Sequence, residues 1–124
     1  MSKVEAREEA LQTLYAADSL DSNAVTDDLS ARAIRLVEGV ISNVVDIDAA
    51  IAAVAKGWRI ERMPPVDRNI LRLAAYELLY TDAPTGVVVS EAVDLAKRFS
   101  TARSGPFVNG VLGKLSESRE RAAT

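Results

Sequence analysis

The sequence contains neither cysteine nor histidine among its 124 residues. Without cysteine there can be no disulfide framework, thiol nucleophile or thiolate metal site. Without histidine the chain lacks the commonest general base and the commonest transition-metal ligand. No apolar run approaches the roughly 18 residues of a membrane span, and the N-terminus lacks the apolar core of a signal peptide. We therefore expect a cytoplasmic protein that is not an enzyme and that uses no metal or cofactor.

The remaining composition is ordinary for a globular protein, with 48% hydrophobic and 27% charged residues. A chain of this length can bury a core without staples, so we expect residues 1–124 to form a single domain. The net charge is −3, yet residues 56–124 hold eleven basic and eight acidic side chains. Dedicated nucleic-acid-binding proteins are far more basic, so any site for a polyanion is expected to be local.

Apolar residues recur at helical spacing, and the glycines and prolines fall almost wholly between the periodic segments. The spacing predicts helices over 2–18, 33–45, 47–58, 65–80, 88–99 and 107–115, with a frayed tail at 116–124. No credible strand pair is present. We therefore predict an all-α fold, a compact single domain of six to seven helices.

Several residues mark the ends and contacts of these helices. Asp46 is expected to cap the third helix and Gly57 to end it. The paired acids Asp46 and Asp48 could instead be catalytic or metal carboxylates, but no third ligand lies near them and capping is favoured. In the last segment, Gly110 and Gly113 suggest close packing against a neighbouring helix.

The segment from Pro64 to Tyr80 is apolar over most of its circumference, which is typical of a central helix. Pro65 suits the first helical position. Asp67 and Glu77 project into the apolar arc, so each needs a partner or water. Either both are structural acids that cap a helix or pair with a cation, or one of them meets another molecule.

No phosphate-binding loop, dinucleotide fingerprint, nucleophile elbow or zinc spacing is present. Basic residues instead occur at the chain start, at Lys3 and Arg7, and around two aromatic residues, Phe99 and Phe107. The second group is formed by Lys97, Arg98 and Arg103. Cations interleaved with aromatic rings suit single-stranded RNA, because bases stack on rings while cations follow the phosphates. The alternative is that the rings belong to the core and the charges are merely solvated.

The chain resembles the NusB family of bacterial transcription antitermination factors along nearly its whole length. The motifs that carry the resemblance occur in the order of the family and are 6–8, 10–15, Trp58, 62–68, 70–78, 91–97 and 107–112. Each motif is weak alone, but together they form a specific pattern. The resemblance implies an all-helical fold made of two small bundles.

The resemblance also implies a function. Members of the family bind the boxA element of nascent ribosomal and phage transcripts, as heterodimers with the ribosomal protein NusE, and join the RNA polymerase antitermination complex. Carried over by position, the RNA-binding residues would be Lys3, Arg7, Phe99 and Phe107. The contacts to NusE would be Tyr15 and Asp67, which is expected at an exposed helix start. Glu77 would keep a structural role, with a basic partner from another helix.

The chain departs from the family at its start, where Val4 and Glu5 replace cations. Each lost phosphate contact weakens binding and flattens its salt dependence, so we expect weak RNA affinity without NusE. Three alternatives remain open. The chain could be a protein-only scaffold, a homodimer that hides the RNA face, or the NusB-like domain that precedes ribosomal RNA cytosine methyltransferases. No methyltransferase domain follows here, so we do not expect the last.

Overall fold

The computed structural model describes the backbone of residues 3–20 and 26–123 and the side chains of residues 5–20 and 26–119. Within these ranges the chain forms six α-helices and one short 3₁₀ helix, with no strand. They are α1 (Lys3–Ser19), α2 (Ala31–Ser42), α3 (Val44–Val54), η1 (Ile60–Arg62), α4 (Pro65–Tyr80), α5 (Thr85–Phe99) and α6 (Ser104–Ala123). The predicted all-α class is confirmed. No helix among these residues is long and apolar enough to cross a membrane.

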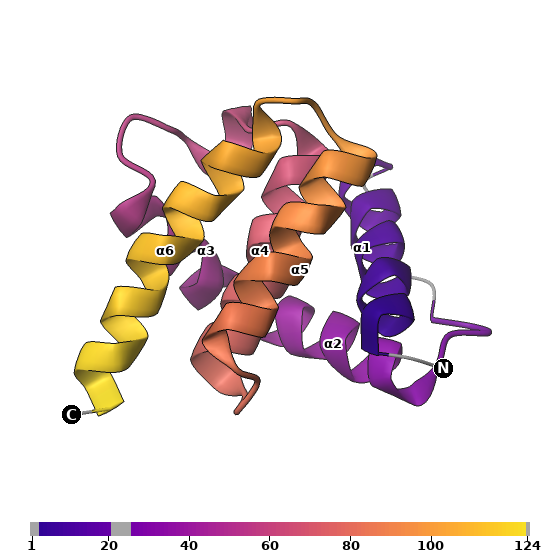
Figure 1. Cartoon of the computed structure of the whole chain (residues 1–124). Coiled ribbons are helices and arrows are strands. Elements are labelled where there is room, and N and C mark those ends of the chain that lie inside the picture. Colours follow the sequence, from indigo (N-terminus) through magenta and orange to yellow (C-terminus); the bar gives the residue numbers. More distant parts are fainter. Residues whose placement is uncertain (1–2, 21–25, 124) are drawn as a thin grey trace.

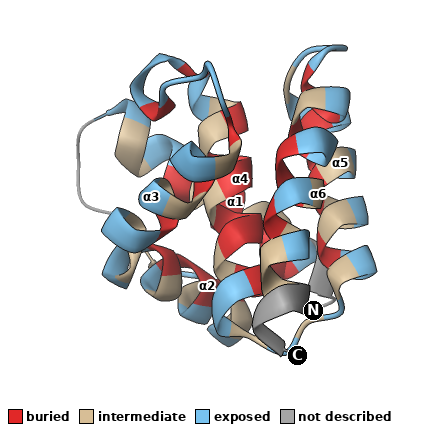
Figure 2. Ribbon diagram, turned by 90° about the vertical axis from the view of Figure 1, so that its left-hand side faces the viewer, coloured by how far each residue is buried: buried red, intermediate tan, exposed pale blue. Residues whose placement is uncertain are grey.

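Helix α4 is the centre of the fold, as its apolar circumference predicts. It packs with α5 and α6 in one small bundle and with α1, α2 and α3 in another, so that the two bundles share one helix. In Figure 1, α5 lies in front of α4, with α1 and α3 to either side. Pro65 occupies its first turn, where a missing N–H costs no hydrogen bond. Figure 2 shows the buried residues along α4 and on the faces of the neighbouring helices that turn toward it.

The boundary between α2 and α3 differs from the prediction. The helices are separated at Asn43, whose side chain donates to the Gly39 carbonyl oxygen at 2.8 Å. Helix α3 therefore begins three residues before the expected start, and Asp46 lies inside its first turn instead of capping it. Asp48 does not cap the helix either, because its carboxylate pairs with Arg72 of α4 at 2.8 Å. The capping interpretation of both acids is wrong.

The end of α3 is also earlier than expected. Gly57 does adopt the left-handed conformation, with φ +84°, but the helix has already ended at Val54. Trp58 therefore lies beyond the helix and is 53% exposed, although its spacing predicts a place in the apolar stripe. The left-handed glycine turns the chain away before the tryptophan can join the stripe.

Helix α6 is longer than the sequence predicts at both ends. It begins at Ser104, within the expected loop, and runs to Ala123, through the tail that was expected to fray. Arg119 supplies the reason, because its guanidinium donates to the carbonyl oxygens of Thr81 and Ala83 at 3.0 and 2.9 Å. These bonds fasten the last turns of α6 to the connection between α4 and α5.

Close packing occurs at a different glycine from those predicted. A β-carbon at Gly110 or Gly113 would meet nothing within 4 Å, so neither glycine is required by a neighbouring helix. At Gly39 of α2, a β-carbon would overlap the ring of Tyr76. The approach of α2 to α4 therefore depends on Gly39.

Candidate nucleic-acid and partner interface

Arg7 and Glu77 form an ion pair inside the molecule. The guanidinium of Arg7 donates to both carboxylate oxygens of Glu77, from Nε at 2.7 Å and from Nη2 at 2.8 Å. Both residues are buried, at 4% and 2% exposure. The hydrogen bonds to Glu77 raise the pKa of Arg7 above its usual value, although burial alone would lower it. The predicted basic partner of Glu77 is thus confirmed, and it is Arg7, one of the proposed RNA-binding residues.

Asp67 is buried as well, at 4% exposure, so the expectation of an exposed carboxylate at the start of α4 is wrong. The connection between α5 and α6 folds over this end of α4. Ser100 donates to Oδ1 of Asp67, and Ser104 donates to Oδ2 at 2.9 Å. The carboxylate therefore ties the first turn of α4 to the loop that follows Phe99.

The polar flank of α4 meets the end of α1. Asp18 accepts hydrogen bonds from Arg68 at 2.8 Å and from Asn69 at 2.9 Å, and Arg72 lies 3.4 Å from the same oxygen. Burial alone would raise the pKa of Asp18, but the hydrogen bonds from Asn69 and Arg68, with the charges of Arg68 and Arg72, lower it below its ordinary value. This network fixes α1 against the N-terminal half of α4.

Phe99 and Phe107 lie on either side of the short connection between α5 and α6. Phe99 is 39% exposed, and the guanidinium carbon of Arg98 lies 4.8 Å from its ring centre. Arg98 also pairs with Glu8 of α1 at 3.0 Å. Phe107 is half-buried against the core. The ring of Phe99 therefore lies at the surface, whereas that of Phe107 lies between the surface and the core.

Trp58 is a residue whose position the sequence did not reveal. Its ring lies 5.2 Å from that of Phe107, at an interplanar angle of 57°. Both rings line a cleft of about 270 Å³ that also includes Lys56 and Lys114. Aromatic rings beside cations therefore occur on the α3–α6 side of Phe107 too. Two signals were available in the sequence: Gly57, which was expected to end the helix just before Trp58, and the place of Trp58 among the family motifs.

The remaining predicted residues belong to α1. Tyr15 is on α1 and is 41% exposed, which leaves its ring accessible. Lys3 begins α1, but its side chain lies outside the described residues. Among the described residues, no group of three acidic side chains could hold a metal ion.

Comparison with known proteins gives a consistent result. The profile of the NusB family matches residues 3–117. The transcription antitermination protein NusB of Acidothermus cellulolyticus is 49% identical over 122 residues, which cover 90% of this chain and 84% of that protein. The NusB of Frankia casuarinae is 54% identical over 92 residues, covering 73% of this chain and 68% of that protein.

Solved structures show the same likeness. NusB of T. maritima superposes with a TM-score of 0.87 at 29% identity, over 100% of this chain and 99% of that chain. A chain from the crystal structure of the antitermination factors NusB and NusE in complex with double-stranded RNA gives a TM-score of 0.82 at 29% identity. That match covers 95% of this chain and 99% of that chain.

Proposed function

The chain belongs to the NusB family, and from this premise we propose that it is a transcription antitermination factor that binds boxA RNA together with NusE. The complex would join RNA polymerase on nascent ribosomal transcripts, in the cytoplasm, with no catalytic step of its own. Residues 1–124 would act as a single domain. The likeness to a NusB chain from a complex with NusE and RNA is the observation that carries the proposal.

The aromatic residues around the α5–α6 connection are the proposed RNA surface. Phe99 is exposed beside Arg98, which suits a base that stacks on a ring while a cation meets its phosphate. Phe107 would contribute from the half-buried side, next to Trp58. Lys3 would add a phosphate contact from the start of α1.

We assign Arg7 a different role in RNA binding from that of the aromatic residues. Its guanidinium is engaged by Glu77, so an indirect role is favoured, in which Arg7 holds the start of α1 in place. The loss of cations at Val4 and Glu5 leaves few phosphate contacts at this end, which supports the expectation of weak RNA binding without NusE.

Tyr15 and Asp67 are the proposed NusE contacts. The exposed ring of Tyr15 can meet a partner directly. The buried carboxylate of Asp67 can act only by holding the loop at Ser100 and Ser104, and partner binding would then depend on the shape of that loop.

The proposal is tested by fluorescence anisotropy of labelled boxA RNA with the chain alone and with NusE, across a salt series. We expect the chain alone to bind RNA weakly, with an affinity that changes little with salt. With NusE present we expect tight binding. Phe99→Ala should weaken the ternary complex by about 1–3 kcal/mol, the value of one stacked base. Tyr80→Ala removes an aromatic ring of similar exposure elsewhere on the surface, at 43%, and should leave affinity unchanged.

Two outcomes would overturn the proposal. Tight and steeply salt-dependent binding without NusE would contradict the partner requirement. Binding of NusE without any RNA affinity would instead favour the protein-only scaffold. The homodimer alternative is tested by light scattering, which would show a dimer that dissociates when NusE is added. Tyr15→Ala, which should weaken NusE binding with unchanged stability, tests the partner surface separately.

A further inference from the structure

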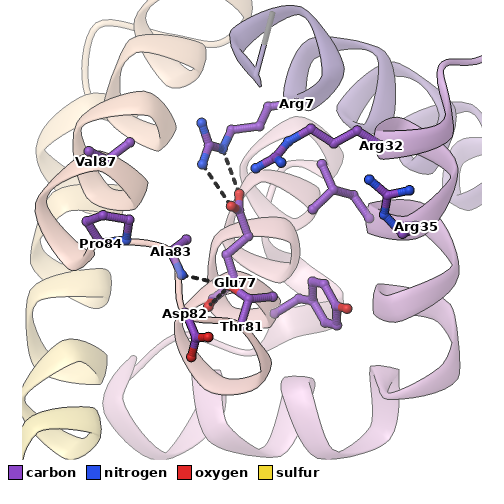
Figure 3. A pocket seen from close by; sticks show the side chains of 11 residues that line it. Arg7, Arg32, Arg35, Glu77, Thr81, Asp82, Ala83, Pro84 and Val87 are labelled. Carbon is purple, nitrogen blue, oxygen red and sulfur yellow. Dashed lines mark hydrogen bonds and ion pairs between the residues drawn. The ribbon is translucent and has the colours of Figure 1, made fainter.

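A cleft of about 740 Å³ lies between α1, α2 and the connection from α4 to α5. Three arginines line it, Arg7 from α1 and Arg32 and Arg35 from α2. Figure 3 shows the guanidinium groups of Arg7 and Arg32 near the carboxylate of Glu77, with that of Arg35 farther along α2. Of the proposed RNA and partner residues whose side chains the structure describes, only Arg7 lines this space.

The charges in the cleft are not balanced. Glu77 is occupied by both hydrogen bonds from Arg7. None of the ion pairs formed by the described residues includes Arg32 or Arg35. The one other acid in the lining, Asp82, is exposed to solvent. Among the described residues, the half-buried Arg32 and the exposed Arg35 therefore lack a counter-ion.

Arg32 carries a more specific signal. Its Nε atom is buried and has no hydrogen-bond partner. No other side-chain nitrogen or oxygen atom among the described residues is both buried and unpaired. A buried donor left unpaired costs about 1–3 kcal/mol, so a ligand that accepts from Nε would recover that free energy. Arg32 itself lines the cleft, so a turn of its guanidinium would bring the buried Nε to a ligand there.

The chemistry of these groups defines the ligand. A guanidinium presents a planar fork of donors that matches the oxygens of a phosphate, and two guanidinium groups match its double charge. We propose that the cleft binds a phosphoryl group, held by Arg32 and Arg35, with the Arg7–Glu77 pair as its fixed floor. The phosphate would accept from Nε of Arg32.

The walls of the cleft are held in place without the ligand. Arg119 donates to the carbonyl oxygens of Thr81 and Ala83 and to the hydroxyl of Thr85 at 3.0 Å. Thr81 and Ala83 belong to the lining. The ion pair with Glu77 fixes α1 on the opposite side. A site that needs little ordering loses less free energy on binding.

This site goes beyond the proposed RNA surface. Val87 of the cleft and Phe99 lie twelve residues apart on α5, which is about 18 Å along a helix. The two sites can therefore be occupied independently. The phosphoryl group could belong to free phosphate or to the backbone of an RNA strand, and the experiment separates the two sources.

The test uses the ¹⁵N-labelled full chain and follows the Nε–H signals of its arginines by NMR. Inorganic phosphate is titrated against chloride at constant ionic strength. We expect saturable shifts at Arg32 and Arg35. Arg32→Gln should weaken phosphate binding at least about tenfold, because a hydrogen bond to a charged group is lost. Arg32→Lys keeps the charge without the fork and should lose part of the affinity.

Arg62→Gln is the matched control, because it removes one exposed positive charge from η1, outside the cleft. It should bind phosphate like the unchanged chain. Non-saturable shifts, or equal losses in Arg62→Gln and Arg32→Gln, would overturn the proposal. A thermal melt of each variant checks that it is folded.

A second titration uses a single-stranded RNA oligonucleotide in place of phosphate. Saturable RNA shifts at Arg32 that phosphate competes away would assign the site to the RNA backbone. A response to phosphate alone would assign it to a free anion, and the RNA proposal at Phe99 would be unaffected. No response at Arg32 to either ligand would refute the site.

Discussion

The two ends of α4 bury one acid each, and they stabilise it in different ways. Glu77 near the C-terminal end meets a guanidinium from α1 in a two-pronged ion pair. Asp67 in the first turn meets only the neutral hydroxyls of Ser100 and Ser104. Both acids are nearly inaccessible to water, so the difference does not arise from burial.

The helix itself explains the contrast. The N-terminal end of a helix carries a partial positive charge, which already favours the carboxylate of Asp67. The C-terminal end carries a partial negative charge, which disfavours that of Glu77. A buried acid at the first end needs only hydrogen-bond donors, whereas one at the second needs a cation. The same residue type thus imposes different demands on its neighbours.

The largest expected effect follows from breaking the ion pair. Glu77→Gln leaves the guanidinium of Arg7 buried without a counter-ion, which typically costs 3–5 kcal/mol, roughly the figure for a broken buried pair. Urea unfolding followed by circular dichroism measures this loss. Glu8→Gln breaks the exposed pair with Arg98 and serves as the control. Similar midpoints for the two variants would mean that the buried pair contributes little.

A smaller effect is expected at the other end. Asp67→Asn removes the charge and one acceptor, so one of the hydroxyls of Ser100 and Ser104 loses its partner. The cost should be about 1–3 kcal/mol, less than for Glu77→Gln. The same unfolding measurement applies. An unchanged midpoint would mean that the carboxylate of Asp67 contributes little to stability and would leave it a role in partner binding alone.

Replacing both members of the ion pair sharpens the comparison further. The double variant Arg7→Met, Glu77→Leu removes both charges and fills the space with apolar atoms. Exchanges of this kind are often neutral or stabilising, so we expect a change within about 1 kcal/mol of the unchanged chain. A loss as large as that of Glu77→Gln would show that the pair is needed for packing as well as for charge balance.

Much of the fold could be predicted from local pattern. The apolar circumference of α4 placed it at the centre, and the acids in that arc were correctly expected to need partners. The identity of those partners could not be predicted. Arg7 lies 70 residues from Glu77 in the chain, and no local rule pairs them.

Two of the errors share a physical cause. The start of α4 was expected to be exposed, but the loop at 100–103 covers Asp67. The polar tail was expected to fray, but Arg119 binds carbonyl oxygens of another loop. In each case polar side chains are fixed by tertiary hydrogen bonds, which hydrophobic spacing does not register. The unpaired Nε of Arg32 could not be predicted from the sequence either, because its burial arises only in the folded chain.

The smallest effect concerns Asp18, which joins α1 to the Asp67 half of α4. Its pKa is lower in the folded chain than its ordinary value. A carboxyl group of this kind stabilises the fold fully above its unfolded pKa and loses that contribution as the pH falls through its folded pKa. Stability should therefore decline below about pH 4, near the unfolded pKa of aspartate. Because the ion pairs are partly exposed, the contribution should not exceed about 1 kcal/mol.

Asp18→Asn should make the acid decline shallower in unfolding experiments between about pH 5 and pH 2, which spans the titration of an aspartate with an ordinary or lowered pKa. Asp28→Asn is the control. Asp28 is exposed and has a φ of 66°, which asparagine also tolerates. The Asp28→Asn variant should lose stability with falling pH as steeply as the unchanged chain. If the two variants lose stability equally steeply with falling pH, the network of Asp18 with Arg68 and Asn69 is not the acid-sensitive contact.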